Sequence, residues 1–337
     1  MNSFEARLID LLQDGLAITD RPFADAAARL RTNEQHVIET VRDLLDDGVL
    51  SRFGPMFNAD ALGGAYSLCA MCVPQDDFDH VTALVNAYPE VAHNYAREHV
   101  LNMWFVIATE STQRISDVVT GIEHQSGLEV FNFPKEEEYC IGLRFSARRA
   151  CRFAPPQKDS RMPVTQPSHR AGSQADAYVP DAADRALVAL TQSGLSLIAK
   201  PFAELGEKLD LSAEQIMNRF RTMLGAGVIR RIGAVPNHYR LGYRANGMSV
   251  WNVADDQVSA AGREIAALDF VTHCYRRPRR EPRWPYNLFA MVHGVERKEV
   301  ETKVAEIAGR LGERARAHDV LYSTRILKKN GFRLPTR

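Results

Sequence analysis

The strongest constraint in this sequence is an internal repeat. The string GLAITDRPFADAAARL, which starts at Gly15, is matched by GLSLIAKPFAELGEKL, which starts at Gly194. The match continues from GVLSRFGPMFNADALGG at Gly48 to GVIRRIGAVPNHYRLGY at Gly227. Self-similarity at a fixed offset indicates repeated structural units, so the chain is predicted to be two copies of one module joined head to tail. The recurring residues are Arg52, Gly54, Asn58 and Leu62, which correspond to Arg231, Gly233, Asn237 and Leu241.

The first part of each copy is predicted to form three short helices. In the third helix, apolar residues recur with the i, i+4, i+7, i+8 spacing of a face that packs on one core. Ser212 and Gln215 have the spacing of a capping box, Asn33 is the matching cap in the first copy, and Gly48 and Gly227 follow the helix ends. Three such helices followed by GVIRRIG are typical of a winged helix-turn-helix domain. The predicted helices are 4–14, 22–31 and 34–47, and 182–191, 201–209 and 213–224.

The second part of each copy alternates predicted strands and helices in the order β-α-β-β-α-β. This order predicts a ferredoxin-like sandwich with both helices on one sheet face, and the fold class is therefore an α+β tandem duplication. The other sheet face is left to bind a ligand or to pack on a second sheet. Two segments, 128–133 and 139–145, compete to be the last strand of the first copy. The remaining elements are predicted at 66–73, 78–87, 92–97, 103–109 and 112–125, and at 245–252, 255–268, 271–276, 288–294, 296–311 and 320–327.

The predicted domains follow from this division and from one change in composition. Residues 152–180 are rich in Pro, Ser, Gln and Ala and hold few large apolar side chains, so they are predicted to be a flexible linker. Helix-turn-helix domains are predicted at 1–60 and 181–240, and ferredoxin-like domains at 61–151 and 241–337. The two copies are expected to form a pseudo-dimer within the chain, with a further homo-oligomer as an open alternative.

The charge balance limits the partners that such a chain can have. Lys and Arg total 42 and Asp and Glu total 42, so no overall field attracts nucleic acid or an anionic membrane. No apolar stretch approaches the roughly 20 residues of a membrane span, and residues 1–20 lack the pattern of a signal peptide. A cytoplasmic protein without a membrane partner is expected. The five cysteines are scattered, which favours reduced thiols, and we assign no metal or redox role to Cys69 and Cys72.

A predicted central strand in each copy carries a row of polar side chains. Positions two apart share one face of a strand. Such a row is costly to bury without partners, and arginine binds carboxylates through two parallel hydrogen bonds. The face therefore predicts a ligand with several carboxylates, for which aromatic side chains supply flat walls. The rows are His93, Tyr95, Arg97 and His99, and His273, Tyr275, Arg277 and Arg279; the aromatic candidates are Trp104, Trp284, Tyr286 and Phe289.

The second row runs into a segment with an excess of arginine. The string HCYRRPRREPRWPYNLF contains an insertion relative to the first copy. Arg276 lies on the predicted strand, whereas Arg279, Arg280 and Arg283 lie on the inserted loop. These loop arginines either close over a polycarboxylate or are ordinary solvated residues. Structural alternatives also stay open for other members: core packing is favoured for Trp104 and Phe289, and His93 and His273 could be satisfied within the sheet.

The order of helix-turn-helix, GVIRRIGAV and βαββαβ resembles the Lrp/AsnC family of transcription regulators over almost the whole of each copy. In that family the second domain pairs sheets and senses amino acids. DNA binding is nevertheless not expected. A recognition helix needs basic or amide side chains to approach phosphates and bases, whereas residues 34–47 hold five acids and one arginine, Arg42. The second copy offers Arg219 and Arg221 but little else, so both helices are interpreted as structural.

A more specific resemblance lies in the strings VAHNYAREHVLNMWFVIAT and VTHCYRRPRREPRWPYNLFAMVHG. Within the Lrp-like frame they are similar to the two subunit types of sirohaem decarboxylase (NirD and NirL, or AhbA and AhbB), fused into one chain. The resemblance implies removal of the carboxyl groups of two acetate side chains of sirohaem. The product would be 12,18-didecarboxysirohaem, on the way to haem d1 or, by another route, protohaem. Other haem-biosynthesis proteins are implied partners.

The resemblance also implies roles for the two rows. Loss of carbon dioxide requires a proton at the remaining carbon, and His93 and His273 are expected to donate it because the histidine pKa lies near neutrality. The alternative role for either is an axial bond to the substrate iron. No resident metal, and no cofactor beyond the iron-containing tetrapyrrole, is expected. Substrate contacts are expected from Tyr95, Arg97, His99, Tyr275, Arg276, Arg277, Arg279, Arg280 and Trp284, with the second copy favoured as the half that holds the substrate.

Two other classes of function stay open. The first is an Lrp-type regulator that binds promoter DNA. The second is a non-catalytic tetrapyrrole carrier or sensor, which the same histidine and arginine face would serve equally well. Anaerobic incubation with sirohaem separates them, because only an enzyme changes the mass of the ligand.

Overall fold

The structure is a computed structural model that describes residues 1–58, 60–142, 144–147 and 178–329. It divides into two compact units, and each unit takes one part from each copy. The helical unit comprises Met1–Asn58 and Phe145–Leu241, and the sheet unit comprises Ala59–Arg144 and Gly242–Arg337. The domain boundaries given above stay predictions. Residues 152–177 of the predicted linker, and Cys151 before them, lie outside the described residues.

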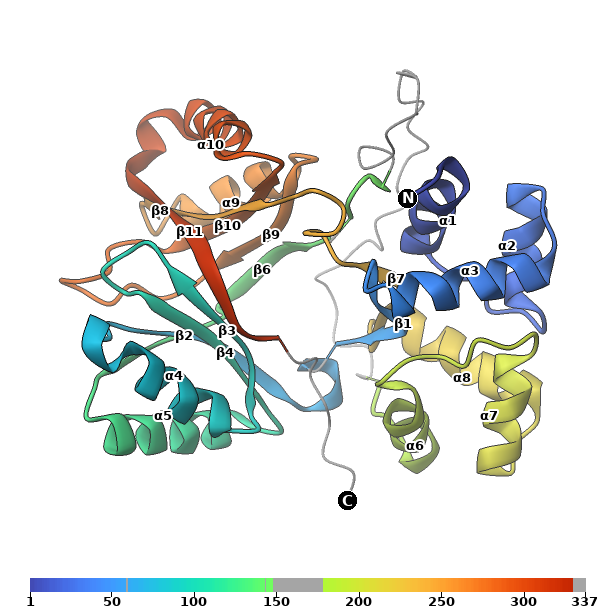
Figure 1. The fold of residues 1–337 in the computed structure, drawn as a ribbon. Coiled ribbons are helices and arrows are strands. Elements are labelled where there is room, and N and C mark those ends of the chain that lie inside the picture. The colour runs from blue at the N-terminus through green and yellow to red at the C-terminus, as the bar shows by residue number, and fades with distance from the viewer. Residues whose placement is uncertain (59, 143, 148–177, 330–337) are drawn as a thin grey trace. The chain divides into compact units, whose positions relative to one another are not determined.

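The helical unit contains the three helices predicted in each copy, and local sequence sets their ends (Figure 1). Asn33 accepts a hydrogen bond from the His36 amide at 2.8 Å and so caps α3. Ser212 forms the predicted capping box of α8. Glycines with positive φ, Gly48 at 68° and Gly227 at 74°, follow these helices. The elements are α1 (Ser3–Asp14), α2 (Pro22–Leu30), α3 (Glu34–Asp46) and β1 (Leu50–Phe57), then α6 (Ala182–Thr191), α7 (Pro201–Leu209), α8 (Ala213–Gly225) and β7 (Ile229–Pro236).

The strand that follows each set of helices pairs with its counterpart in the other copy. β1 and β7 run antiparallel, with Gly54 directly opposite Gly233. A Cβ at Gly54 would lie 2.8 Å from the Leu195 backbone nitrogen, and a Cβ at Gly233 would overlap the Leu12 carbonyl oxygen. Both glycines therefore recur because each admits the backbone of the other copy at close range.

The recurring arginines have the same reciprocal geometry. The Arg52 guanidinium donates to the Gln192 carbonyl at 3.1 Å, and the Arg231 guanidinium donates to the Gln13 carbonyl. Gln192 caps the end of α6, and Gln13 lies in the last turn of α1. The last carbonyls of a helix have no hydrogen-bond partner within it. Each arginine therefore supplies a donor to such a carbonyl at the end of the first helix of the other copy.

The sheet unit confirms the predicted α+β fold class. Its described strands form one antiparallel sheet in the order β5-β2-β4-β3-β11-β8-β10-β9-β6. Each copy keeps the ferredoxin-like order, in which the fourth strand pairs with the first and the third lies between the first and second. The elements are β2 (Ala65–Met71), α4 (Phe78–Ala87), β3 (Val91–Arg97), β4 (Met103–Thr109), α5 (Thr112–Ser126), β5 (Val130–Pro134) and β6 (Glu137–Ile141), then β8 (Ala245–Val253), α9 (Val258–Ala266), β9 (Val271–Arg276), β10 (Leu288–Gly294), α10 (Arg297–Leu311) and β11 (Ala315–Lys329).

The last strand of each copy is shared between the copies. β11 pairs with β8 of its own copy up to Tyr322, and from Ser323 onward it pairs with β3 of the first copy. In the first copy two separate strands make the corresponding pairings. β5 pairs with β2 of its own copy, and β6 pairs with β9 of the second copy. Both segments that competed for the last strand are therefore strands, each with a different partner.

Helices cover one face of each sheet half, and the opposite faces pack on each other. α4 and α5 lie on the first half, and α9 and α10 lie on the second. The face that was left unassigned thus packs on the other half of the sheet, around the fully buried Trp104 and Trp284. Each such ring removes about 150–250 Å² from water. This inter-sheet cluster consists of Ala70, Leu101, Trp104, Phe131, Phe133, Met248, Val250, Trp284, Phe289 and Leu321.

Candidate functional site

The predicted polar rows lie at equivalent places on β3 and β9. The ring centroids of His93 and Tyr95 are 6.4 Å apart in the first row. Those of His273 and Tyr275 are 6.2 Å apart in the second. Each row continues into an arginine whose guanidinium lies over the tyrosine ring, at 5.8 Å for Arg97 and 4.9 Å for Arg277. Strand periodicity therefore brings together three of the four residues of each row that were predicted to share a face.

Each row is bordered by a strand from the other copy. Tyr95 lies opposite Ile326 of β11, and Tyr275 lies opposite Glu138 of β6. Directly opposite residues of an antiparallel pair share a face. The surroundings of each row are consequently composite, with side chains from both halves of the chain.

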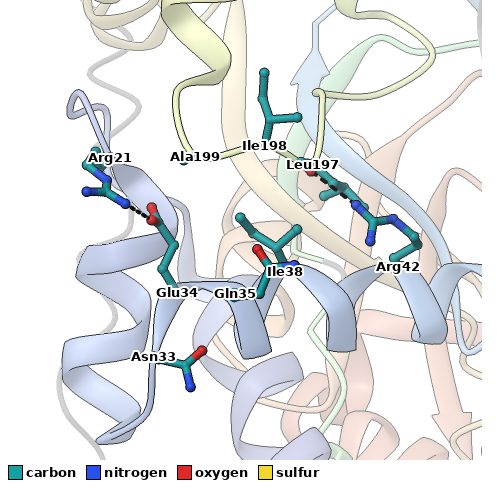
Figure 2. A pocket seen from close by; sticks show the side chains of 9 residues that line it. All are labelled: Arg21, Asn33, Glu34, Gln35, Ile38, Arg42, Leu197, Ile198 and Ala199. Carbon is teal, nitrogen blue, oxygen red and sulfur yellow. Dashed lines mark hydrogen bonds and ion pairs between the residues drawn. The ribbon is translucent and has the colours of Figure 1, made fainter.

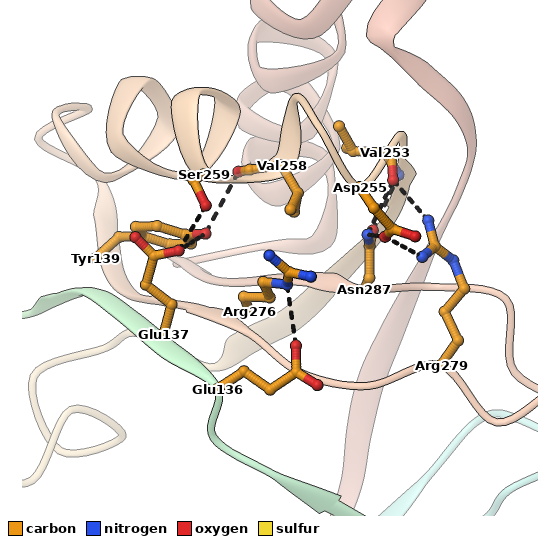
Figure 3. Close-up of polar contacts among 10 residues, drawn as sticks. All are labelled: Glu136, Glu137, Tyr139, Val253, Asp255, Val258, Ser259, Arg276, Arg279 and Asn287. Carbon is orange, nitrogen blue, oxygen red and sulfur yellow. Dashed lines mark hydrogen bonds and ion pairs between the residues drawn. The ribbon is translucent and has the colours of Figure 1, made fainter.

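The strand beside the second row is acidic, but its charges are compensated. Glu136 pairs with Arg276 at 2.9 Å, and Glu138 pairs with Lys135 at 2.8 Å. Figure 3 shows the Arg276 side chain directed at Glu136. The segment of β11 beside the first row carries Arg325, whose guanidinium lies 5.6 Å from the Phe78 ring of α4. Both glutamates therefore have a cationic partner, and Lys135 is shared with Asp60.

Two arginines of the second copy, Arg277 and Arg280, bind the edge strand β5 of the first copy. The Arg277 guanidinium is buried and donates to the Phe133 carbonyl at 2.5 Å. Arg280 donates to the Asn132 carbonyl through Nε at 2.9 Å and Nη2 at 2.6 Å. Burial lowers the pKa of Arg277 to about 10. Consecutive carbonyls of β5 are therefore satisfied by arginines that were predicted to clamp substrate.

Arg279 also has a dense set of protein partners. Its guanidinium reaches the Asp255 carboxylate at 2.5 Å and the Val253 carbonyl at 2.6 Å (Figure 3). Asn287 donates to the same carboxylate at 3.0 Å. Arg279 thus fixes the inserted loop to the end of β8 in this conformation, and its role as a substrate contact stays a prediction.

Three further predicted contacts occupy the border between the sheet halves. The Arg97 guanidinium is buried and donates to the Leu321 carbonyl at 2.8 Å. His99 lies in the loop after β3, where its Nε2 is 3.7 Å from the Asp319 carboxylate. Burial lowers the pKa of His99, while Asp319 opposes this shift. Trp284 is 0% exposed and lies at the centre of the inter-sheet cluster, so its structural role here is core packing.

One hydrogen-bonded chain at the second row was not predicted. His273 Nδ1 is 3.1 Å from the Thr272 hydroxyl, and this hydroxyl is 3.0 Å from His293 Nε2. His293 Nδ1 is in turn 2.6 Å from the Asn246 side-chain oxygen. Thr272, His293 and Asn246 were not among the site residues predicted from the sequence. The sequence feature that could have pointed to these residues is that the first copy has different residue types at the equivalent positions.

The cysteines and carboxylates do not gather into a metal centre in the part of the chain that the structure describes. No group of three or more His, Cys, Asp or Glu side chains is placed to hold an ion there. Cys69 is buried on β2, whereas Cys72 is exposed. Burial raises the pKa of Cys69 to about 12, which keeps it a neutral thiol.

Four arginines of the helix-turn-helix surface have partners within the protein. Figure 2 shows Arg42 of α3 directed at the Leu197 carbonyl, 3.3 Å away, and Arg21 directed at Glu34. The pocket at this place has a volume of about 630 Å³. On α8, Arg219 pairs with Asp181 and Asp184, and Arg221 pairs with Glu214. The lining of the pocket consists of Arg21, Asn33, Glu34, Gln35, Ile38, Arg42, Leu197, Ile198 and Ala199.

None of the described helices combines the length and the apolar character that a bilayer-spanning helix requires.

Fold and site together define the chain as an Lrp/AsnC-type ligand-binding protein with a duplicated frame. The model of the AsnC-like ligand binding domain matches residues 61–139 and 240–328. The model of the siroheme decarboxylase NirDL-like HTH domain matches residues 5–50 and 184–230. A siroheme decarboxylase NirDL subunit of Paracoccus denitrificans is 33% identical over 98% of this chain and 97% of that protein. The chain belongs to the siroheme (sirohaem) decarboxylase family.

Relatives of half this length are more similar still. The siroheme decarboxylase NirH subunit of Paracoccus pantotrophus is 56% identical over 46% of this chain and 96% of its own length. The NirG subunit of Pseudomonas aeruginosa is 46% identical over 43% of this chain and 99% of its own length.

Solved structures agree with this assignment. A crystal structure of siroheme decarboxylase NirDL has a TM-score of 0.70 at 26% identity, covering 98% of this chain and 93% of that chain. The structure of NirDL in co-complex with an iron-uroporphyrin III analogue has a TM-score of 0.68 at 26% identity, covering 96% and 92%.

Proposed function

We propose that this chain is a carboxy-lyase that decarboxylates two acetate side chains of sirohaem, giving 12,18-didecarboxysirohaem in haem d1 biosynthesis. The observation that carries the proposal is the similarity to a siroheme decarboxylase over nearly the whole length of both chains. The two rows on β3 and β9 add the residue types that the reaction needs. The solved relative with an iron-uroporphyrin III analogue supports a tetrapyrrole with many carboxylates as the ligand.

The reaction needs a proton donor and no oxidant. The bond between the acetate methylene and its carboxylate breaks, carbon dioxide leaves, and the electron pair stays on a carbon that the macrocycle can stabilise. A proton then converts the methylene to a methyl group. We assign this donation to His93 and His273, because histidine titrates near neutral pH and general acids of this kind contribute about 10²–10⁴-fold. Because the step is redox-neutral, the proposal includes no cofactor beyond the substrate's own iron.

Two acetates react, and the fold offers two rows. We favour the second row for substrate binding, as the sequence predicted. Its border strand is acidic, but Arg276 and Lys135 pair with Glu136 and Glu138. These cations reduce the repulsion that a carboxylate approaching Tyr275 would meet at this border. The axial bond from His93 or His273 to the substrate iron stays the alternative role.

The decisive experiment is anaerobic incubation of the full chain with sirohaem, followed by mass spectrometry of the tetrapyrrole. We expect loss of two carboxyl groups. His93→Ala and His273→Ala should each slow at least one loss by about 10²-fold or more, and each should still bind the ligand. His124→Ala, at an exposed position of α5, is the matched control and should react at the parent rate.

Other outcomes identify other functions. An absorbance change without a change in mass would make the chain a carrier or sensor and would overturn the proposal. A salt-dependent complex with promoter DNA would favour an Lrp-type regulator. The engagement of Arg42, Arg219 and Arg221 with protein partners speaks against such a complex. A cytoplasmic location stays a prediction.

The half-length relatives suggest how the chain is organised. We infer that each copy is the counterpart of one separate NirG- or NirH-type subunit, because these subunits are covered almost completely by less than half of this chain. The shared strands β6 and β11 then make the chain a covalent pseudo-dimer. Other haem-biosynthesis proteins that supply sirohaem or accept the product are the proposed partners.

A further inference from the structure

We propose that Thr272 and His293 are positioning residues that fix which nitrogen of His273 carries the reacting proton. The inference rests on the proposed function, in which His273 is a proton donor. It starts from the continuous chain His273 Nδ1 to Thr272 Oγ1 at 3.1 Å, Thr272 Oγ1 to His293 Nε2 at 3.0 Å, and His293 Nδ1 to Asn246 Oδ1 at 2.6 Å.

The chemistry of the groups gives the chain a direction. An amide oxygen only accepts hydrogen bonds, so His293 Nδ1 donates to Asn246 and the Nε2 of neutral His293 becomes an acceptor. The Thr272 hydroxyl donates to that Nε2, and its lone pairs then accept from His273 Nδ1. The other acceptor near this hydroxyl, the Met291 carbonyl, is more distant at 3.4 Å. Neutral His273 therefore keeps its proton on Nδ1.

Because these groups are buried, reversing the order of donors and acceptors along the hydrogen-bonded chain is costly. Thr272 is 5% exposed, and His293 and Asn246 are each 6% exposed. In such an interior, leaving a donor or acceptor without its partner costs the full desolvation of that group. Reversing one bond of the chain would leave two donors or two acceptors facing each other. His273 itself is only partly buried, so the interior chain holds a ring that also reaches the protein surface.

The first copy lacks this chain. Ala92, Ala108 and Tyr66 stand where the second copy has Thr272, His293 and Asn246. The equivalence follows from the strand register, because Tyr66 lies opposite Ala108 just as Asn246 lies opposite His293. The two candidate proton donors are thus set differently, and only His273 is joined to a histidine in the interior through a threonine.

The consequence concerns the proton-transfer step. With Nδ1 fixed as the inner donor, Nε2 of protonated His273 is the nitrogen that gives up its proton. When the acetate bond breaks and carbon dioxide leaves, this proton forms the new bond to carbon. His273 is left neutral with its hydrogen on Nδ1, and Nε2 then regains a proton from water.

The test uses the whole protein, residues 1–337, with ¹⁵N-labelled histidine. Long-range ¹H–¹⁵N spectra of the neutral ring report which nitrogen of His273 is protonated, with His273→Ala to assign the signals and His93 as the internal control. Thr272→Val removes the hydroxyl and keeps the branched shape that suits a strand. Thr272→Ser keeps the hydroxyl. Single-turnover decarboxylation of sirohaem and affinity for iron-uroporphyrin III are measured on the same proteins.

We expect the parent and Thr272→Ser to hold neutral His273 as the Nδ1–H form, and Thr272→Val to give a mixture of both forms. The Thr272→Val decarboxylation rate should fall about tenfold or more, as part of the 10²–10⁴-fold that general acid catalysis contributes. Affinity for iron-uroporphyrin III and the His93 signals should not change.

Two results would overturn the inference. One is a parent protein whose neutral His273, assigned with His273→Ala, carries its hydrogen on Nε2. The other is a Thr272→Val protein with the parent tautomer and the parent rate. If the parent leaves the mass of sirohaem unchanged, the proposed function fails instead, while the spectra still decide the tautomer.

Discussion

His273 in the second copy lies directly opposite Ile141 of the first copy, in register across β9 and β6. Its counterpart His93 lies opposite Lys329, which belongs to the second copy. Each candidate proton donor is therefore bordered by a strand that the other half of the chain supplies. One copy alone therefore supplies the residues of a row but not the strand that borders it.

Cutting the chain within residues 152–177 should leave its two halves associated. β6 and β11 each pair with a strand of the other copy, and the inter-sheet cluster draws side chains from both. We expect a protease site placed in this segment to give two fragments that co-elute on size exclusion and still convert sirohaem. Fragments that separate at micromolar concentration would show that the pairing does not hold the halves together.

Gly262→Ala should weaken the docking of β6 on α9. A Cβ at Gly262 would overlap the Tyr139 ring, which β6 places against this helix. Overpacking of this kind costs about 1–3 kcal/mol, and urea unfolding measures it. Gly309→Ala is the control: it lies in α10 with nothing within 4 Å of the added Cβ. It should raise the unfolding free energy by up to about 1 kcal/mol.

Trp284→Ala should destabilise the sheet unit by about 3–5 kcal/mol, the usual cost of truncating a large buried ring. The Trp284 ring centroid lies 5.0 Å from that of Trp104 and 5.4 Å from that of Phe133. Trp284→Phe should recover much of this stability and bind iron-uroporphyrin III like the parent. If Trp284→Ala instead weakens ligand binding without changing the urea midpoint, the residue is a ligand wall and not a core residue.

Asp255→Asn should lower stability slightly at neutral pH and not at all in acid. The hydrogen bond from Arg279 lowers the pKa of Asp255 below its ordinary 3.8. The unfolded chain therefore binds this proton more readily than the folded chain. The contribution is present above about pH 4 and is lost as the pH falls through the lowered pKa. Because the carboxylate is largely exposed, we expect less than about 1 kcal/mol.

Thermal unfolding of Asp255→Asn between pH 3 and 7 measures this effect. Asp256→Asn removes the same charge from the next residue and serves as the control. A stability difference between Asp255→Asn and the parent that grows below pH 4 would contradict the assignment.

Sequence alone determined the local elements and the faces of the strands. Capping residues such as Asn33 and Ser212 act within one helical turn, and the alternation that aligns His93, Tyr95 and Arg97 is a property of any strand. Because the chain is duplicated, each helix and strand was predicted in both copies, and the agreement between the copies supported each prediction. This is why the fold class, and the three residues of each row that share a face, could be predicted from the sequence.

Only the tertiary structure decided which partners those residues meet. The exchange of β6 and β11 depends on hydrogen bonds between segments far apart in the chain. Backbone N–H and C=O groups are alike in almost every residue, so the sequence does not indicate which strand they will pair with. For the same reason Arg277 could not be assigned in advance to the Phe133 carbonyl, nor Thr272 to His293. A guanidinium or hydroxyl donates to any acceptor within hydrogen-bond distance, and the packing of the two copies determines which acceptors those are. The sequence thus determined what chemistry each face carries, and the packing of the two copies decided what that chemistry is directed at.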